Sequence, residues 1–292
     1  MNTLIDQFLS AYQGRLKPSS LSDYRSILHH HLAFFPDLPA MSLGLEDYLS
    51  GLALTGKRKN NILCVARTFY GWAARRQIAP GPMLPIPRFP HRTVKTKPLS
   101  LEEARQVMSF TPQPYRDFYR LSILTGLRTG EALALQFQDF DLAHQVLRIR
   151  RAFSGGVISS TKTASSDRDI PLLRPVRELY EQRQRYNLKS SPWFFYSGKG
   201  GIFSLKKLRE VWRVFLELFG IEPRRMYSTR HTFASLAIAA GEDALWVARV
   251  LGHSRPDQLF LRYASFMEGM KEDGKKFLGA LSAQSFNLRL AK

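Results

Sequence analysis

Hydrophobic residues near the start of the chain recur every three or four positions. This spacing holds in residues 4–12, 21–32 and 45–52, and it places the apolar side chains of each segment on one face of a helix. A fourth helix is predicted from about residue 60 to residue 77, with a buried face made of Ile62, Val65, Phe69 and Trp72. The first part of the chain is therefore expected to be an all-helical unit.

The rest of the chain mixes helices with a short run of strands. Ser100 and Glu103 have the spacing of a capping box before an amphipathic helix, and further helices are predicted at 115–124 and from Thr129. Polar and apolar residues then alternate in QVLRIRRAF, VISSTKT and RDIPL, with SGG as the first turn. Helices resume at Arg174, and the aromatic run PWFFYS is expected to lie in the core. The predicted fold is mainly α with a small antiparallel β-sheet.

A proline-rich stretch separates the two parts. Residues 79–98 hold six of the 16 prolines in the chain, and the second half of the stretch is basic. Proline lacks a backbone donor and opposes both helices and central strands, so an extended linker is expected. The predicted division is a helical unit at 1–85, a basic linker at 86–98 and a mixed α and β unit at 99–292.

The charge balance indicates the kind of partner. Lysine and arginine number 43 against 24 acidic residues, which gives a net charge of +19 over 292 residues. Such an excess attracts polyanions, so nucleic acid is the expected partner, with a merely basic surface, as in some ribosome-associated or secreted proteins, as the alternative. Cys64 is the only cysteine, which excludes an internal disulfide and a cysteine-rich zinc site.

The sequence contains no pattern typical of export or membrane insertion. Its first ten residues, MNTLIDQFLS, include acidic and polar positions, and no run reaches the roughly 18 apolar residues of a membrane span. The protein is therefore expected to be cytoplasmic, to associate with the nucleoid, and to have no membrane partner.

Cations gather around the fourth predicted helix and in the linker. One lysine or arginine alone is more typical of an ordinary solvated surface, but so many of them together favour a surface that faces DNA. The candidate DNA-binding residues are Arg58, Lys59, Arg67, Arg75, Arg76, Lys95 and Lys97. The three histidines at 29–31 are not expected to bind a metal, because consecutive helical residues point about 100° apart.

Five residues in the second part form a set suited to cleaving a phosphodiester. Arg128 in TGLRTGEALAL and Arg230 in YSTRHTFASLA stand near helix starts, where an arginine fork and backbone N–H groups both favour a phosphate. Lys162 lies at or just past the end of the second strand, in STKTASSDRDIPL, and Tyr263 follows His253 by ten residues in LGHSRPDQLFLRYASF. Metal-ligand spacing is absent from the sequence, so side chains are expected to supply the positive charge without a metal or cofactor.

These boxes, in this order, resemble those of the tyrosine recombinases, also called the phage integrase family. The resemblance covers residues 97–265. It implies a mixed α+β catalytic domain, preceded by a helical, SAM-like core-binding domain that grips the opposite side of the duplex. It also implies site-specific DNA recombination, with integration and a mobile-element origin among the possible programmes.

The resemblance further implies a role for each matching residue. Tyr263 attacks the scissile phosphorus and becomes a 3′-phosphotyrosyl link, with release of a 5′-hydroxyl. Arg128 and Arg230 clamp the nonbridging oxygens, and His253 donates a hydrogen bond to the phosphate. Lys162 is the general acid that protonates the leaving 5′ oxygen.

Two further positions complete the candidate site. Glu131, three residues after Arg128, is expected to orient that guanidinium as a supporting residue. Tyr227 stands where the family usually has a histidine, and its ordinary pKa of about 10 makes it a poor base at neutral pH. Either another group assists Tyr263 or proton removal lags behind attack. His231 is expected to pack structurally, because it points in another direction from the helix than the preceding arginine does.

The resemblance implies double-stranded DNA as substrate and a homotetramer on paired sites, with accessory DNA-bending proteins as further candidate partners. The tail at about 266–292 is expected to dock on a neighbouring protomer or on its own domain. Two alternatives remain open. One is a type IB topoisomerase, which uses the same chemistry as a monomer. The other is an architectural DNA-binding protein that has lost catalysis, with Tyr227 as its first sign.

Overall fold

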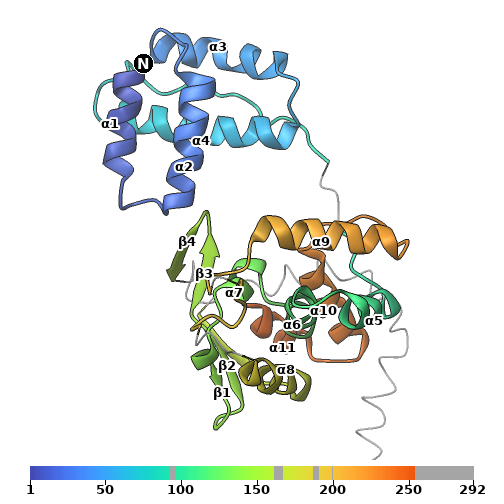
Figure 1. Cartoon of the computed structure of the whole chain (residues 1–292). Helices are drawn as coiled ribbons and strands as arrows, with labels where there is room; N and C mark the ends of the chain where they lie inside the picture. The colour runs from blue at the N-terminus through green and yellow to red at the C-terminus, as the bar shows by residue number, and fades with distance from the viewer. Residues whose placement is uncertain (93–95, 161–166, 187–190, 199, 254–292) are drawn as a thin grey trace, which may run out of the picture. The chain divides into compact units, whose positions relative to one another are not determined.

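The structure is a computed structural model that describes residues 1–92, 96–160, 167–186, 191–198 and 200–253. The chain divides into two compact units, Met1–Lys95 and Thr96–Lys292, whose elements are labelled in Figure 1. Each unit has a hydrophobic core of its own. Within the described residues, no helix combines the length and the apolar character that crossing a membrane requires.

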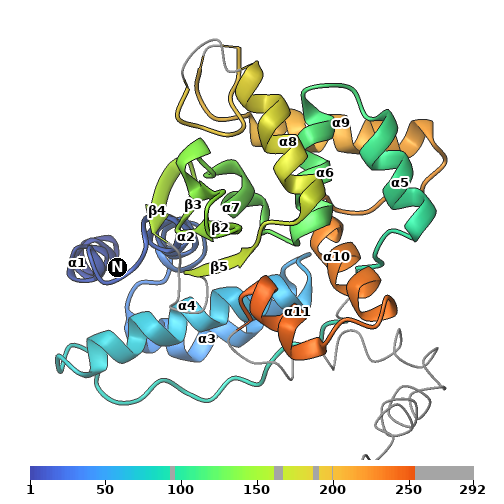
Figure 2. The same ribbon diagram turned by 90° about the horizontal axis from the view of Figure 1, so that it is seen from below.

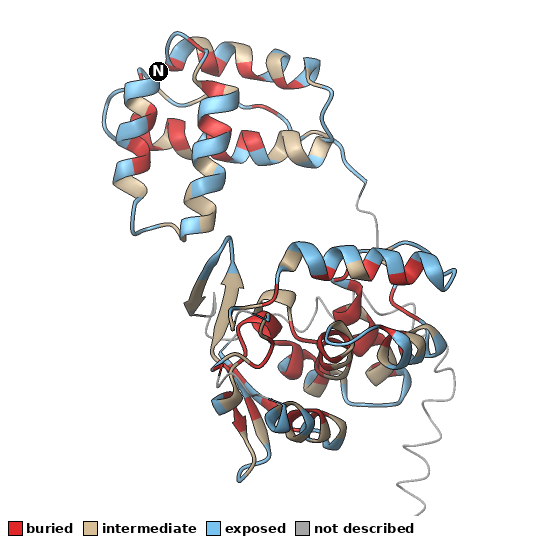
Figure 3. Cartoon of the chain, viewed as in Figure 1, coloured by how far each residue is buried: buried red, intermediate tan, exposed pale blue. Residues whose placement is uncertain are grey.

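The first unit consists of helices whose apolar faces meet in one core. They are α1 (Asn2–Tyr12), α2 (Pro18–Ile27), the π-helical turn η1 (Leu28–Leu32), α3 (Leu38–Gly51) and α4 (Gly56–Ala74). Phe8 on α1 and Phe69 on α4 are fully buried, and their rings meet edge to face with centroids 5.3 Å apart. Figure 3 shows buried residues along α1, α3 and α4, whereas α2 is buried only at Ile27, its last residue. The all-helical character predicted from the spacing is confirmed.

The fourth helix begins earlier than the hydrophobic pattern predicts. It starts at Gly56 rather than near residue 60, because the hydroxyl of Thr55 accepts a hydrogen bond from the backbone N–H of Arg58 at 3.3 Å and caps the first turn. Its predicted inward face is confirmed, with buried Ile62, Val65, Phe69 and Trp72.

The proline-rich segment after α4 packs against the first unit. It has no helix or strand in its described residues, but Ile86 is only 4% exposed and belongs to the first core. Asn60 on α4 holds the segment with both ends of its amide: Nδ2 donates to the carbonyl of Phe89 at 2.8 Å, and Oδ1 accepts from the N–H of Phe89 at 2.9 Å. The beginning of the predicted linker is therefore anchored to α4.

The histidines at 29–31 contact three different partners. His29 lies 3.7 Å from a carboxylate oxygen of Asp6, His30 bonds the carbonyl of Ser26, and His31 bonds the hydroxyl of Tyr48 at 2.9 Å. The three side chains diverge, as the helical geometry predicts.

The second unit surrounds its core with helices and short strands. Its helices are α5 (Leu101–Phe110), α6 (Tyr115–Thr125), α7 (Thr129–Leu133), the 3₁₀ turn η2 (Phe137–Asp139), α8 (Arg174–Arg185), α9 (Leu205–Leu218), α10 (Ser228–Ala239) and α11 (Ala244–Leu251). The capping box of Ser100 and Glu103 is present at the start of α5. Phe194 and Phe195 of PWFFYS are fully buried, so the predicted core position of these two residues is confirmed. Figure 2 shows α10 between α6 and α11, and it packs on both.

The strands form two small antiparallel sheets rather than the single sheet predicted. One sheet has the order β1-β2-β5, and the other is a hairpin of β3 and β4. The strand bounds are β1 (Phe140–Asp141), β2 (Val146–Ile149), β3 (Arg151–Ser154), β4 (Val157–Ser160) and β5 (Arg168–Pro171). The expected strand QVLRIRRAF divides at Arg150, so its first half pairs with β5 and its second half with β4. The mainly α class with antiparallel strands is confirmed.

Candidate active site

Two helix ends meet in the second unit. α6 is followed by Gly126 and α11 by Gly252, and both glycines have the left-handed backbone conformation, with φ of 63° and 66°. A Cβ atom on Gly126 would lie 2.5 Å from Cδ1 of Phe233 and 2.6 Å from Cδ2 of Leu251. Both the turn and the close packing therefore require glycine at this point. The last carbonyl groups of a helix lack intrahelical partners, so they are available to side-chain donors.

Arg230 is enclosed between these two helix ends. It lies in the first turn of α10 and is 2% exposed. Its Nη1 donates to the carbonyl of Gly126 at 2.9 Å, and its Nη2 donates to the carbonyl of Leu251 at 2.7 Å. Burial lowers the pKa of Arg230 to about 10, which leaves the guanidinium charged at neutral pH. The negative ends of the two helix dipoles help to stabilise this buried charge.

Arg128 stands at the start of α7, directly after the turn that ends α6. Its Nη1 donates to Oε1 of Glu131 at 2.6 Å, its Nη2 donates to the carbonyl of Gly252 at 3.2 Å, and its backbone N–H donates to Oε2 of Glu131 at 3.0 Å. The predicted contact between Glu131 and this guanidinium is confirmed. The side chain of Arg128 is 36% exposed, so it is far more open than Arg230.

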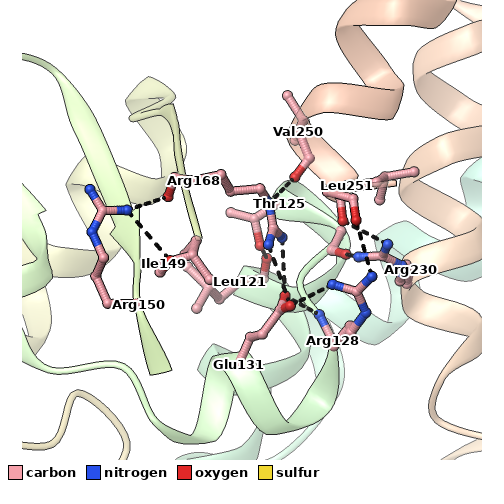
Figure 4. A network of polar contacts seen from close by, with 12 residues as sticks. Leu121, Thr125, Arg128, Glu131, Ile149, Arg150, Arg168, Arg230, Val250 and Leu251 are labelled. Carbon is pink, nitrogen blue, oxygen red and sulfur yellow. Dashed lines mark hydrogen bonds and ion pairs between the residues drawn. The ribbon is translucent and has the colours of Figure 1, made fainter. Parts of the chain in front are cut away.

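Glu131 lies at the centre of the polar network in Figure 4 and is 2% exposed. Arg168 on β5 donates to it through Nη2 at 3.0 Å and through Nη1 at 3.4 Å. Burial by itself raises the pKa of Glu131, but the charges and hydrogen bonds of Arg168 and then Arg128 outweigh burial, and the pKa lies below its usual range. Glu131 is therefore ionised at neutral pH.

Sequence reasoning missed Arg168, although the sequence contains a signal for it. Along β5, Arg168 and Ile170 are buried while Asp169 and Pro171 are exposed. Alternate residues of a strand share one face. An arginine two positions before an isoleucine on the same strand shares its buried face, which indicates that the arginine side chain points into the protein.

The structure places the remaining candidate residues as follows. Tyr227 precedes α10 and is 40% exposed, and its ring meets the ring of His231 edge to face with centroids 5.3 Å apart. The half-buried His253 comes directly after the turn that ends α11, and its backbone N–H donates to the carbonyl of Ala248 at 3.0 Å. Lys162 and Tyr263 lie outside the described residues, as does the tail at 266–292.

Several of the predicted DNA-binding cations have partners within the protein. Lys59 donates to the carbonyl of Ser50 at 3.1 Å, Arg67 donates to the carbonyl of Ile86, Arg76 lies over the ring of Trp72, and Lys97 pairs with Glu222 at 2.9 Å. Arg58 is half-buried and Arg75 is exposed, while Lys95 lies outside the described residues. For Lys59, Arg67, Arg76 and Lys97 the structure therefore gives a packing role beside the predicted one.

A groove of about 520 Å³ lies between α4 and the proline-rich segment of the first unit. Its lining includes the cations Lys57, Arg67 and Arg88 and the amide of Asn61. Cations and amide donors together suit the phosphate oxygens of a nucleic-acid backbone. This groove is the candidate nucleic-acid surface of the first unit.

The sequence matches the phage integrase family over residues 97–268, which is more than half of the chain. The chain belongs to the phage integrase family. Among its relatives in that family, the prophage integrase IntR of Escherichia coli (strain K12) is 23% identical over 228 residues, which cover 70% of this chain and 56% of IntR. The ICEBs1 integrase of Bacillus subtilis (strain 168) is 24% identical over 275 residues, which cover 86% of this chain and 75% of that integrase. The match thus spans little more than half the length of IntR.

The fold agrees with that of a solved transposon integrase. The Tn1549 transposon integrase, described in complex with a circular intermediate DNA, has a TM-score of 0.73 and 16% sequence identity, and the match covers 89% of this chain and 93% of the other. At this identity the similarity establishes the fold. The resemblance seen in the sequence boxes is confirmed at the level of family and fold.

Proposed function

We propose that this protein is a tyrosine-type site-specific recombinase that cleaves and rejoins DNA through a 3′-phosphotyrosyl intermediate on Tyr263. The observation that carries the proposal is the arginine cluster at the ends of α6 and α11. Within the described residues, Arg128, Arg168 and Arg230 share one buried carboxylate, that of Glu131. The excess positive charge suits an anionic group whose charge grows during the reaction, as it does on a phosphodiester under attack.

The proposed chemistry transfers a phosphoryl group from the 5′ oxygen of the DNA to Tyr263. The Oη of Tyr263 bonds to phosphorus as the bond from phosphorus to the 5′ oxygen breaks, and the phenolic proton passes to a neighbouring base during attack or to water after it. Lys162 protonates the departing 5′ oxygen, and Arg128 and Arg230 hold the nonbridging oxygens on which negative charge accumulates. His253 donates a further hydrogen bond to the phosphate. Attack by a 5′-hydroxyl on the phosphotyrosyl link reverses these steps, so rejoining needs no external energy source.

We propose double-stranded DNA as the substrate and a homotetramer on two paired sites as the working assembly. The groove of the first unit would contact the phosphate backbone through its cations, which makes binding dependent on salt. Support for a DNA substrate comes from the net charge of +19 and from the DNA-bound state of the Tn1549 transposon integrase.

The decisive experiment traps the covalent intermediate. Nicked suicide duplexes made from DNA that flanks the gene would be incubated with the protein, because loss of the short fragment prevents rejoining. We expect a covalent adduct on a denaturing gel for the wild type and none for Tyr263→Phe. Tyr186→Phe is a matched control, since Tyr186 is 74% exposed on the second unit, and it is expected to keep the adduct.

Each other outcome would point to a different nucleophile or a different function. An adduct that persists in Tyr263→Phe would exclude this nucleophile. Tight duplex binding without an adduct would favour an architectural DNA-binding protein. Relaxation of supercoiled plasmid that lacks paired sites would favour a type IB topoisomerase.

A further inference from the structure

Three consecutive carbonyl groups at the C-terminal end of α11 each accept a hydrogen bond from a different arginine. The pairs are Val250 with Arg168, Leu251 with Arg230, and Gly252 with Arg128, at 2.6, 2.7 and 3.2 Å. These arginines come from β5, from α10 and from the start of α7. The final carbonyls of a helix lack intrahelical partners and form the negative end of its dipole, so they favour cations. The end of α11 is a common anchor for the cluster.

Arg168 connects this anchor to Glu131. Its Nε donates to Val250, while Nη2 and Nη1 donate to the two carboxylate oxygens. The side chains of Arg168 and Glu131 are 7% and 3% exposed, so both are almost removed from water. One guanidinium therefore joins three elements, β5, α7 and α11, and supplies the main charge beside the buried carboxylate.

The state of Glu131 affects Arg128 directly. Burial disfavours an ionised carboxylate, and Arg168 is its largest source of compensation, ahead of Arg128. Without Arg168, Glu131 would be more easily protonated, and a neutral acid holds a guanidinium more weakly than a carboxylate does. Arg128 is partly exposed and would then be less firmly oriented.

We propose that Arg168 is a positioning residue for recombination, which keeps Glu131 ionised against Arg128 and fixes the end of α11 that leads into His253. The catalytic part of this inference rests on the proposed function. Nε, Nη1 and Nη2 of Arg168 all donate to acceptors within the protein, so Arg168 acts through Arg128 and the helix end and not as a phosphate clamp.

The first test compares the pH dependence of adduct formation in the wild type and in Arg168→Gln. In the part of the chain that the structure describes, three charged groups face Glu131: Arg128 from the start of α7, Arg168 from β5 and Arg230 from α10. We expect Arg168→Gln to slow adduct formation about 10- to 100-fold at neutral pH, the size of loss that follows from a slightly misplaced catalytic group. As the pH is lowered, the rate of adduct formation in Arg168→Gln should also begin to fall at a higher pH than in the wild type, because Glu131 becomes protonated sooner.

Two companion variants separate positioning from general structural damage. Arg168→Lys keeps the charge, so it should recover part of the rate and restore the acid side of the pH profile. Glu131→Gln in the Arg168→Gln background should remove the new loss at low pH, since the titrating group is gone. Arg174→Gln is the matched control, because Arg174 lies at the start of α8, its side chain is 90% exposed, and it pairs with Glu178 on the same helix.

The second test follows unfolding and does not depend on cleavage. In the wild type the lowered pKa of Glu131 contributes stability above the ordinary pKa of glutamate, and this contribution is lost as the pH falls through the folded-state pKa. In Arg168→Gln that pKa rises, so the loss of stability relative to the wild type should be greatest at neutral pH and should shrink on acidification.

An unchanged pH profile of adduct formation, or a stability difference independent of pH, would overturn the inference. Absence of an adduct in the wild type would instead count against the proposed function, while the unfolding experiment would still test the coupling between Arg168 and Glu131. If Arg168→Gln does not fold, Arg168→Lys tests the positioning itself. A lysine keeps the charge but cannot bond Val250 and both carboxylate oxygens of Glu131 as the guanidinium does, so a wild-type rate of adduct formation in Arg168→Lys would overturn the inference.

Discussion

The two units of this protein place their positive charge differently. In the described part of the first unit no charged residue is buried, and the groove cations Lys57 and Arg88 lie at the surface. In the second unit, Arg168 and Arg230 are buried and bound to backbone carbonyls that belong to other elements. An exposed cation acts as one of several interchangeable charges, whereas a buried guanidinium has a single place that its neighbours define.

This difference has an energetic origin. A surface cation remains hydrated, so its removal leaves nothing unsatisfied. A buried guanidinium has been removed from water, and its removal leaves several buried acceptors without a donor. We therefore expect substitutions in the second unit to have large and specific effects, and substitutions in the first unit to have small and additive ones.

The largest effect is expected for Arg230→Ala. Loss of one preorganised donor to the reacting phosphate should reduce adduct formation by about 100- to 1,000-fold, while most duplex binding remains. The measurements are the rate of adduct formation on suicide duplexes, the duplex affinity, and a thermal melt that verifies folding. Arg174→Ala is the control, because the Arg174 side chain is 90% exposed and pairs with Glu178 on the same helix. Binding that falls in proportion to activity would contradict the assignment.

Gly126→Ala tests how tightly the helix end that holds Arg230 is packed. Gly126 has a positive φ, and an added Cβ would lie 2.5 Å from Cδ1 of Phe233, so alanine is strained at this position. We therefore expect a loss of about 1–3 kcal/mol in the free energy of unfolding. Gly51→Ala in the first unit is the counterpart, since a Cβ there meets nothing within 4 Å and should cost little. Equal losses in urea unfolding would remove the contrast between the two units.

The smallest effect is expected for one groove cation. Arg88→Ala should weaken duplex binding by a similar factor on unrelated sequences and reduce the slope of log affinity against log salt by about one, because a phosphate contact carries no sequence information. Arg88→Lys should restore most of the affinity. The measurement is a salt titration of duplex binding, and loss of sequence preference in Arg88→Ala would show that this arginine reads bases instead.

Spacing along the sequence was sufficient to predict contacts whose two residues lie within one turn of a helix. The capping box of Ser100 and Glu103 and the contact between Arg128 and Glu131 each join residues three positions apart. The start of α4 was misplaced because apolar spacing begins after the polar turn that Thr55 caps. The proline-rich segment was expected to be a linker, since its composition does not reveal that Asn60 and the first core hold its beginning.

The sequence by itself determined the helical first unit, the family, and the arginines near helix starts, because repeated spacing and ordered motifs express these properties locally. Only the tertiary structure decided that Arg168 meets Glu131 across 37 positions and that Arg128 meets Gly252 across 124. It also divided the strands into two sheets at Arg150. Such contacts form when core packing brings distant helix ends and strands together, and a buried arginine then binds whichever acceptors the packing has left unsatisfied.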